Sequence, residues 1–170
     1  MNIIGIDFED WYHPELVKRN IKDEKHEPVV LKGIDKIIDL LRKYDTSATF
    51  FLVGELLYEH PELLDKIIEN DHEIAFHTMH HDRLDSKNFS EKFDDELDEF
   101  HKLTDGKSKG FRAPTFSLNQ TSSWLIDKLE KHDLSIKDTI GLRLQSRLTK
   151  EQAKFVSKCR SVHRDISLNF

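Results

Sequence analysis

The segment Ala48–Gly54 reads ATFFLVG, a run of apolar and β-favouring residues closed by a glycine. A short apolar run bounded by a turn residue is typical of a buried strand. Three further short runs occur at Ile3–Ile6, Glu73–Phe76 and Lys109–Arg112. Each of the four runs is followed by a segment with helical spacing of apolar residues. Strand and helix therefore alternate four times, which predicts an α/β fold with a parallel sheet or a βα barrel.

The helical segments have recognisable patterns and start signals. Apolar residues recur at helical spacing between Val30 and Leu41. Pro61 followed by Glu62 suits the first turn of a helix, and Ser90 and Thr121 are candidate N-cap residues. We expect one helix after each of these signals.

Length and composition narrow the class of protein. The chain has 170 residues and a formal net charge of -6, which suits one folded domain and argues against nucleic acid as the main partner. Cys159 is the only cysteine, so neither an internal disulfide nor a four-cysteine zinc site can form. No run approaches the roughly 20 apolar residues of a membrane span, and the N-terminus lacks the pattern of a signal peptide. We therefore expect a cytoplasmic protein.

The end of the chain differs from the rest in charge and in apolar pattern. From Lys137 onward there are eight Lys or Arg residues against three Asp or Glu residues, and clean strand patterning ends after Leu134. We predict a first domain at residues 1–133 and a basic tail at residues 134–170, helical or irregular, with a polar helix over Gln145–Cys159. Such a tail could be a basic interaction face or a poorly specified segment.

The segment His77–His81 reads HTMHH and is the strongest chemical signal. On a helical turn, His77 and His81 would lie on one face and could hold one divalent metal ion, with zinc, cobalt, nickel and iron all suited to imidazole. A histidine-rich surface loop without metal is the alternative.

Carboxylates and an arginine follow two other strands. Asp7, Glu9 and Asp10 lie within four residues, and such crowding is relieved by a cation or a shared proton. One carboxylate with two histidines makes a metal site with open positions, and a second carboxylate can act as general base. Arg112, followed by Ala113 and Pro114, could orient a carboxylate. The alternatives are a solvated acidic turn and an ordinary surface ion pair.

Taken together and in this order, the three motifs resemble those of the polysaccharide deacetylases of carbohydrate esterase family 4. The resemblance extends over roughly Ile3 to His132 and includes the strand at Ala48–Gly54. It implies a partial (βα) barrel of the polysaccharide deacetylase type and a metal-dependent hydrolase that removes N-acetyl groups from a polysaccharide or oligosaccharide. The implied cofactor is a divalent metal ion, zinc, and the implied partner is an N-acetylated glycan substrate.

The resemblance also implies roles for individual residues. Asp7 would be the catalytic base, and Arg112 would hold it in position. His77 and His81 would be metal ligands. The common family form has two adjacent aspartates, whereas this chain reads Asp-x-Glu-Asp, so the resemblance leaves two carboxylates open as the third ligand. Asp10 is expected, with Glu9 as the alternative.

The sequence departs from the family after the arginine motif. The family's late Leu-His motif, which supplies a proton to the leaving amine, is absent, because His132 comes too early and His163 stands in Ser-Val-His-Arg. This pattern predicts a truncated or altered domain whose open sheet edge could favour self-association. Two alternatives therefore stay open: an inactive remnant that binds metal or glycan, and a cyclic-amide hydrolase on the same scaffold.

Overall fold

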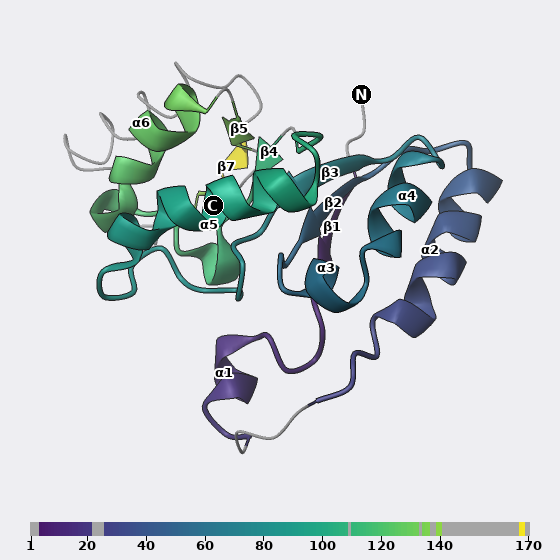
Figure 1. Cartoon of the computed structure of the whole chain (residues 1–170), viewed down its shortest axis with the longest axis horizontal. Helices are drawn as coiled ribbons and strands as arrows, with labels where there is room; N and C mark the ends of the chain where they lie inside the picture. The colour runs from purple at the N-terminus through teal and green to yellow at the C-terminus, as the bar shows by residue number, and fades with distance from the viewer. Residues whose placement is uncertain are drawn as a thin grey trace.

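The fold is built on a five-stranded parallel sheet, which the computed structural model in Figure 1 places at the centre of the molecule. The structure describes residues 4–21, 26–108, 110–132, 134–136, 139–140 and 167–168. Neighbouring strands follow chain order, β1-β2-β3-β4-β5, and every pairing is parallel. This arrangement confirms the predicted α/β class. The strands are β1 (Gly5–Phe8), β2 (Thr49–Leu52), β3 (Glu73–Phe76), β4 (Gly110–Phe111) and β5 (Ser135–Ile136).

Helices connect the strands, as a parallel sheet requires. In Figure 1, α2 and α4 lie beside β1 to β3, whereas α5 and α6 lie toward β4 and β5. Two predicted start signals are wrong: Asn88, with a left-handed backbone, precedes α5 in place of Ser90, and Ser123 precedes α6 in place of Thr121. The helices are α1 (Glu15–Lys18), α2 (Leu31–Lys43), α3 (Leu56–Glu59), α4 (Glu62–Ile68), α5 (Phe89–Leu103) and α6 (Trp124–Lys131), with short turns of 3₁₀ helix at Pro114–Phe116 and Gln120–Ser122.

The two faces of the sheet have different roles. Side chains alternate between the faces of a strand, and Phe8, Phe50 and Phe76 belong to the main hydrophobic cluster formed with the helices. Phe51 is also buried but does not belong to that cluster. It lies on the opposite face, where the guanidinium of Arg112 packs on its ring.

The described part of the predicted tail contains strands. β5 pairs with β4, so the sheet continues past residue 133, and β6 (Thr139–Ile140) pairs in parallel with β7 (Ser167–Leu168). The predicted helix over residues 145–159 lies outside the described residues, as do Cys159 and His163. Among the helices that the structure describes, none combines the length and apolar character needed to cross a membrane.

Candidate metal and catalytic site

The predicted site residues lie at the carboxyl ends of three strands. Asp7 is in β1, His77 directly follows β3, and Arg112 directly follows β4. Since these strands are parallel and paired through β2, their carboxyl ends lie at one edge of the sheet. In α/β folds this edge is where ligands bind.

Asp7 and Arg112 form an ion pair between Oδ1 and Nη1. The guanidinium of Arg112 also lies over the ring of Phe51, 3.7 Å from its centroid. Gly5 makes this position available, because a Cβ atom at Gly5 would collide with Nη2 of Arg112 and lie 2.9 Å from Cε2 of Phe51. The salt bridge to Asp7 and the ring of Phe51 thus hold Arg112 in place, and the missing side chain of Gly5 leaves room for its guanidinium.

His77 and His81 come together through a loop and not through the helical turn considered above. Thr78 and His81 have left-handed backbones, with φ of 61° and 56°, and the two imidazole centroids are 5.0 Å apart. The loop is anchored at Met79, which is fully buried. A Cβ atom at Gly54 would collide with the Met79 sulfur, so this glycine allows the loop to pack against β2.

Hydrogen bonds define the tautomers of both histidines. Nδ1 of His77 donates to the carbonyl of Arg112 at 2.8 Å, and Nδ1 of His81 donates to the carbonyl of His13 at 3.2 Å. Since a carbonyl can only accept, Nδ1 carries the proton in each ring. Burial lowers the pKa of His77 to about 4, opposed in part by the charge of Asp7. The neutral His77 ring therefore presents the Nε2 lone pair that metal ligation needs.

Glu9 is the carboxylate that faces the histidines. Its Oε2 lies 3.0 Å from Nε2 of His81, and this oxygen is buried without a hydrogen bond. Burial would raise the pKa of Glu9, but the contact with His81 outweighs it and lowers the pKa. A buried carboxylate oxygen opposite an imidazole Nε2 needs a proton or a cation between the two atoms.

Asp10 is not brought to the histidines. Its carboxylate is buried and accepts backbone N–H groups from Trp11 at 2.8 Å, from Val29, and from Val30 at 2.8 Å. Val29 and Val30 immediately precede α2, so Asp10 caps that helix from 19 residues away. Oδ2 accepts both N–H groups at the start of α2, and Oδ1 accepts the N–H of Trp11, so both carboxylate oxygens have hydrogen-bond donors.

His13 and Glu55, which the sequence did not indicate as site residues, form a supporting layer behind His81. The fully buried His13 accepts the Asp10 N–H at Nδ1, 2.7 Å away, so its Nε2 donates to Oε1 of Glu55 at 2.7 Å. Oε2 of Glu55 contacts Nδ1 of His80 at 2.7 Å. The partial burial of Glu55 opposes ionisation, yet hydrogen bonds from His13 and His80 hold its pKa well below the ordinary value. In the sequence, only their positions could have indicated these two residues, because His13 follows β1 and Glu55 follows β2.

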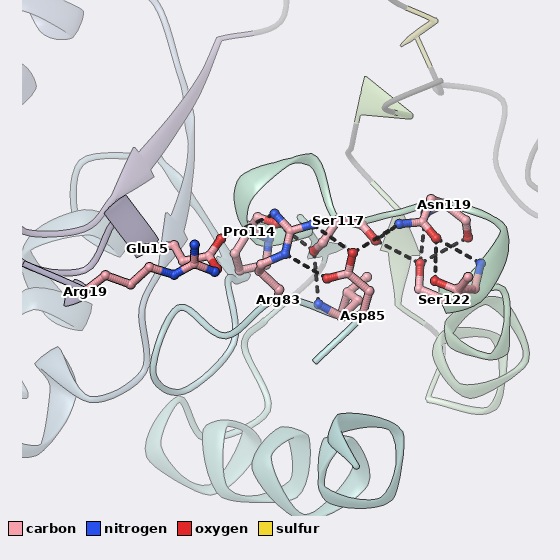
Figure 2. A network of polar contacts seen from close by, with 10 residues as sticks. Glu15, Arg19, Arg83, Asp85, Pro114, Ser117, Asn119 and Ser122 are labelled. Atoms are coloured by element: carbon pink, nitrogen blue, oxygen red, sulfur yellow. Dashed lines mark hydrogen bonds and ion pairs between the residues drawn. The ribbon is translucent and has the colours of Figure 1, made fainter. Parts of the chain in front are cut away.

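Helix α1 is linked to the loops after β3 and β4 by a polar network (Figure 2). Arg83 makes two 2.7 Å hydrogen bonds to Asp85 and a 3.5 Å contact with Glu15 of α1. Asp85 also accepts a 3.5 Å hydrogen bond from Asn119. The loops after β1, β3 and β4 are therefore tied together around the edge that carries the site.

The donor atoms fit a divalent metal ion in chemistry. Within the described residues, no group of three or more His, Cys, Asp or Glu side chains stands in the geometry of a metal site. His77, His81 and Glu9 nevertheless supply two imidazoles with defined tautomers and one unpartnered carboxylate oxygen. Two histidines and a carboxylate are a common donor set for catalytic zinc.

Comparison with known proteins identifies related sequences. Residues 28–133 match the family model described as polysaccharide deacetylase. A peptidoglycan-N-acetylglucosamine deacetylase of Bacillus cereus is 37% identical over 71 residues, covering 34% of this chain and 33% of the relative. The peptidoglycan-N-acetylmuramic acid deacetylase of Bacillus subtilis is 30% identical over 83 residues, covering 46% of this chain and 31% of the relative. The chain thus matches about a third of the length of these relatives.

Solved structures share the fold. A crystal structure of a peptidoglycan N-acetylglucosamine deacetylase superposes with a TM-score of 0.59 at 18% identity, covering 81% of this chain and 55% of that chain. A family 4 carbohydrate esterase pseudoenzyme from Bacillus anthracis gives a TM-score of 0.58 at 18% identity, covering 79% and 41%. These likenesses confirm the partial (βα) barrel of the polysaccharide deacetylase type.

Proposed function

Because the chain belongs to the polysaccharide deacetylase family, we propose that it is a metal-dependent hydrolase that removes N-acetyl groups from a glycan. The observation that carries the proposal is the buried Oε2 of Glu9, 3.0 Å from Nε2 of His81 and without a hydrogen bond. A cation held by His77, His81 and Glu9 would satisfy this oxygen. Among the residues expected from the sequence, the proposal takes Glu9 as the carboxylate ligand and Asp10 as the cap of α2.

A divalent metal ion, zinc in our proposal, would supply the positive charge that polarises the acetamide carbonyl. Asp7 accepts the proton of the attacking water. Its side chain is 41% exposed, so water can reach it. Arg112 fixes the orientation of Asp7 through their ion pair. Together these residues place a general base beside the donor set, which amide hydrolysis requires.

A second candidate function is metal or glycan binding without turnover. The sequence contains no Leu-His pair after Arg112, and the fold resembles that of a carbohydrate esterase pseudoenzyme. In this case the chain would retain the donor set without the Leu-His motif that the family uses to protonate the leaving amine.

Metal content and acetate release test the proposal. We expect about one zinc per chain after dialysis in limiting zinc, and release of acetate from N-acetylchito-oligosaccharides. The His77→Ala, His81→Ala double variant should lose both. His60→Ala, which alters a histidine after α3 and outside the site, should retain both. Zinc without acetate release would favour the second candidate, and equal zinc in the double variant would refute the assigned site.

A further inference from the structure

Phe116 combines two features that cost free energy and that its packing does not explain. Its side chain is 66% exposed. Both Phe116 and the preceding Thr115 have left-handed backbones, with φ of 51° and 54°. Residues with a Cβ atom rarely adopt this conformation, and when they do they concentrate at functional sites.

The surrounding loop is held rigidly in the conformation that exposes this ring. Ala113, Pro114, Ser117 and Leu118 on either side are all buried. Ser117 donates through its backbone N–H and its hydroxyl to the carbonyl of Pro114, at 3.0 and 2.6 Å. The Ser117 hydroxyl also accepts the N–H of Leu84 at 3.0 Å. As Figure 2 shows, this serine belongs to the same polar network as Arg83 and Asp85.

The position of Phe116 relates it to the candidate site. It follows Arg112 by four residues, beyond the carboxyl end of β4. Trp11, which is 48% exposed, directly follows Glu9 and Asp10 beyond the carboxyl end of β1. Since β1 and β4 flank β2 and β3 in the sheet, the two aromatic residues follow strands on either side of the histidine loop.

We propose that Phe116 is a platform for the apolar face of a sugar ring adjacent to the ring that loses its acetyl group. A phenylalanine side chain has no polar atom, so it selects a ligand with an apolar face, which a pyranose presents through its axial C–H groups. The inference rests on the proposed function and specifies its substrate as an oligomer that extends over at least two sugar rings.

Binding of N-acetylchitopentaose, measured by isothermal titration calorimetry on the full chain, tests the platform. Phe116→Ala should weaken binding about tenfold, the scale expected for loss of one buried apolar contact, or about 1.4 kcal/mol. Phe116→Tyr should restore affinity to within about twofold. Binding of the N-acetylglucosamine monomer should be equal in all three proteins.

Tyr44→Ala is the matched control. Tyr44 is 65% exposed, like Phe116, but follows α2 and lies at the amino end of the sheet. Its substitution should leave affinity for the pentasaccharide unchanged.

Phe116→Gly separates a ligand site from a structural role. It should bind as weakly as Phe116→Ala yet have a higher urea midpoint than that variant, because glycine adopts a left-handed backbone without strain.

The failures of the two proposals are distinguishable. Wild-type affinity for the pentasaccharide in Phe116→Ala would overturn the platform and leave the hydrolase proposal intact. No binding by the unsubstituted chain, together with a normal zinc content, would overturn the glycan assignment and with it the platform. Loss of zinc on mutation of His77 and His81 is measured separately.

Discussion

Glu9 and Asp10 are adjacent in the chain, yet the structure predicts opposite consequences for their substitution. Asp10 accepts backbone hydrogen bonds from Val29 and Val30 at the start of α2 and a third from the adjacent Trp11. Each hydrogen bond to a charged group contributes about 1.5–3 kcal/mol when its partner is fully buried. These three are part-buried, so water replaces a portion of that contribution. We expect Asp10→Ala to lower the free energy of unfolding by about 3 kcal/mol and Asp10→Asn by about 1–2 kcal/mol.

Urea unfolding followed by far-UV circular dichroism measures this loss. With a slope of about 2 kcal/mol per molar urea, the Asp10→Ala midpoint should fall by about 1.5 M. The zinc stoichiometry of the folded Asp10→Ala variant should remain that of the wild type, because this carboxylate is committed to the helix cap.

Glu9→Gln should show the reverse. Its metal-free form should lose less stability than Asp10→Ala, because Glu9 gives up one contact with His81 whereas Asp10 gives up three backbone hydrogen bonds. Its zinc affinity, measured by competition with a chromophoric chelator, should fall by more than the roughly 10- to 100-fold that loss of an outer-shell partner costs. An Asp10→Asn variant with wild-type stability and lost zinc binding would refute the division of roles.

Two further predictions concern other parts of the structure. Gly54→Ala should lower the free energy of unfolding in urea by about 1–3 kcal/mol, because the added methyl group collides with Met79. Gly33→Ala in α2 should raise it by about 0.5–1 kcal/mol, because a Cβ atom there meets nothing within 4 Å. Equal effects of the two substitutions would contradict the packing argument. The hydrogen bond from Arg83 lowers the pKa of Asp85 below its ordinary value of 3.8, so this pair contributes stability above pH 3.8 that is lost as the pH falls through the lowered pKa. Arg83→Gln should therefore be less stable than the wild type at pH 6, and the difference should shrink at pH 3; a difference that is constant with pH would show that the pair does not stabilise the fold.

Much of the framework could be predicted from the sequence because its signals are local. The apolar run at Ala48–Gly54 became β2 with Gly54 two residues beyond the strand, and the pattern from Val30 to Leu41 became most of α2. The histidine loop could not be predicted in this way. Its shape depends on left-handed residues at 78 and 81 and on the packing of Met79 against Gly54, which are 25 residues apart.

The supporting layer of His13 and Glu55 could not be predicted either, because it also depends on contacts between distant parts of the chain. His13 and Glu55 are 42 residues apart, and neither belongs to a recognisable local pattern. Their partnership follows from the parallel pairing of β1 with β2, which brings the segments after the two strands together. Only the three-dimensional structure therefore connects Glu55 to His81, through the backbone of His13.

The choice between Glu9 and Asp10 was, by contrast, open to an argument from strand geometry. Side chains alternate along an extended segment, and Phe8 is part of the apolar core. If the extended conformation continues past β1, Asp7 and Glu9 lie on one side, and Phe8 and Asp10 lie on the other. The observed contacts follow that division: Asp7 pairs with Arg112 and Glu9 faces His81, whereas Asp10 turns back to the start of α2. A carboxylate placed two residues after Asp7 therefore shares its face, so an Asp-x-Glu spacing brings both side chains to one side of an extended segment, whereas adjacent carboxylates would point to opposite sides.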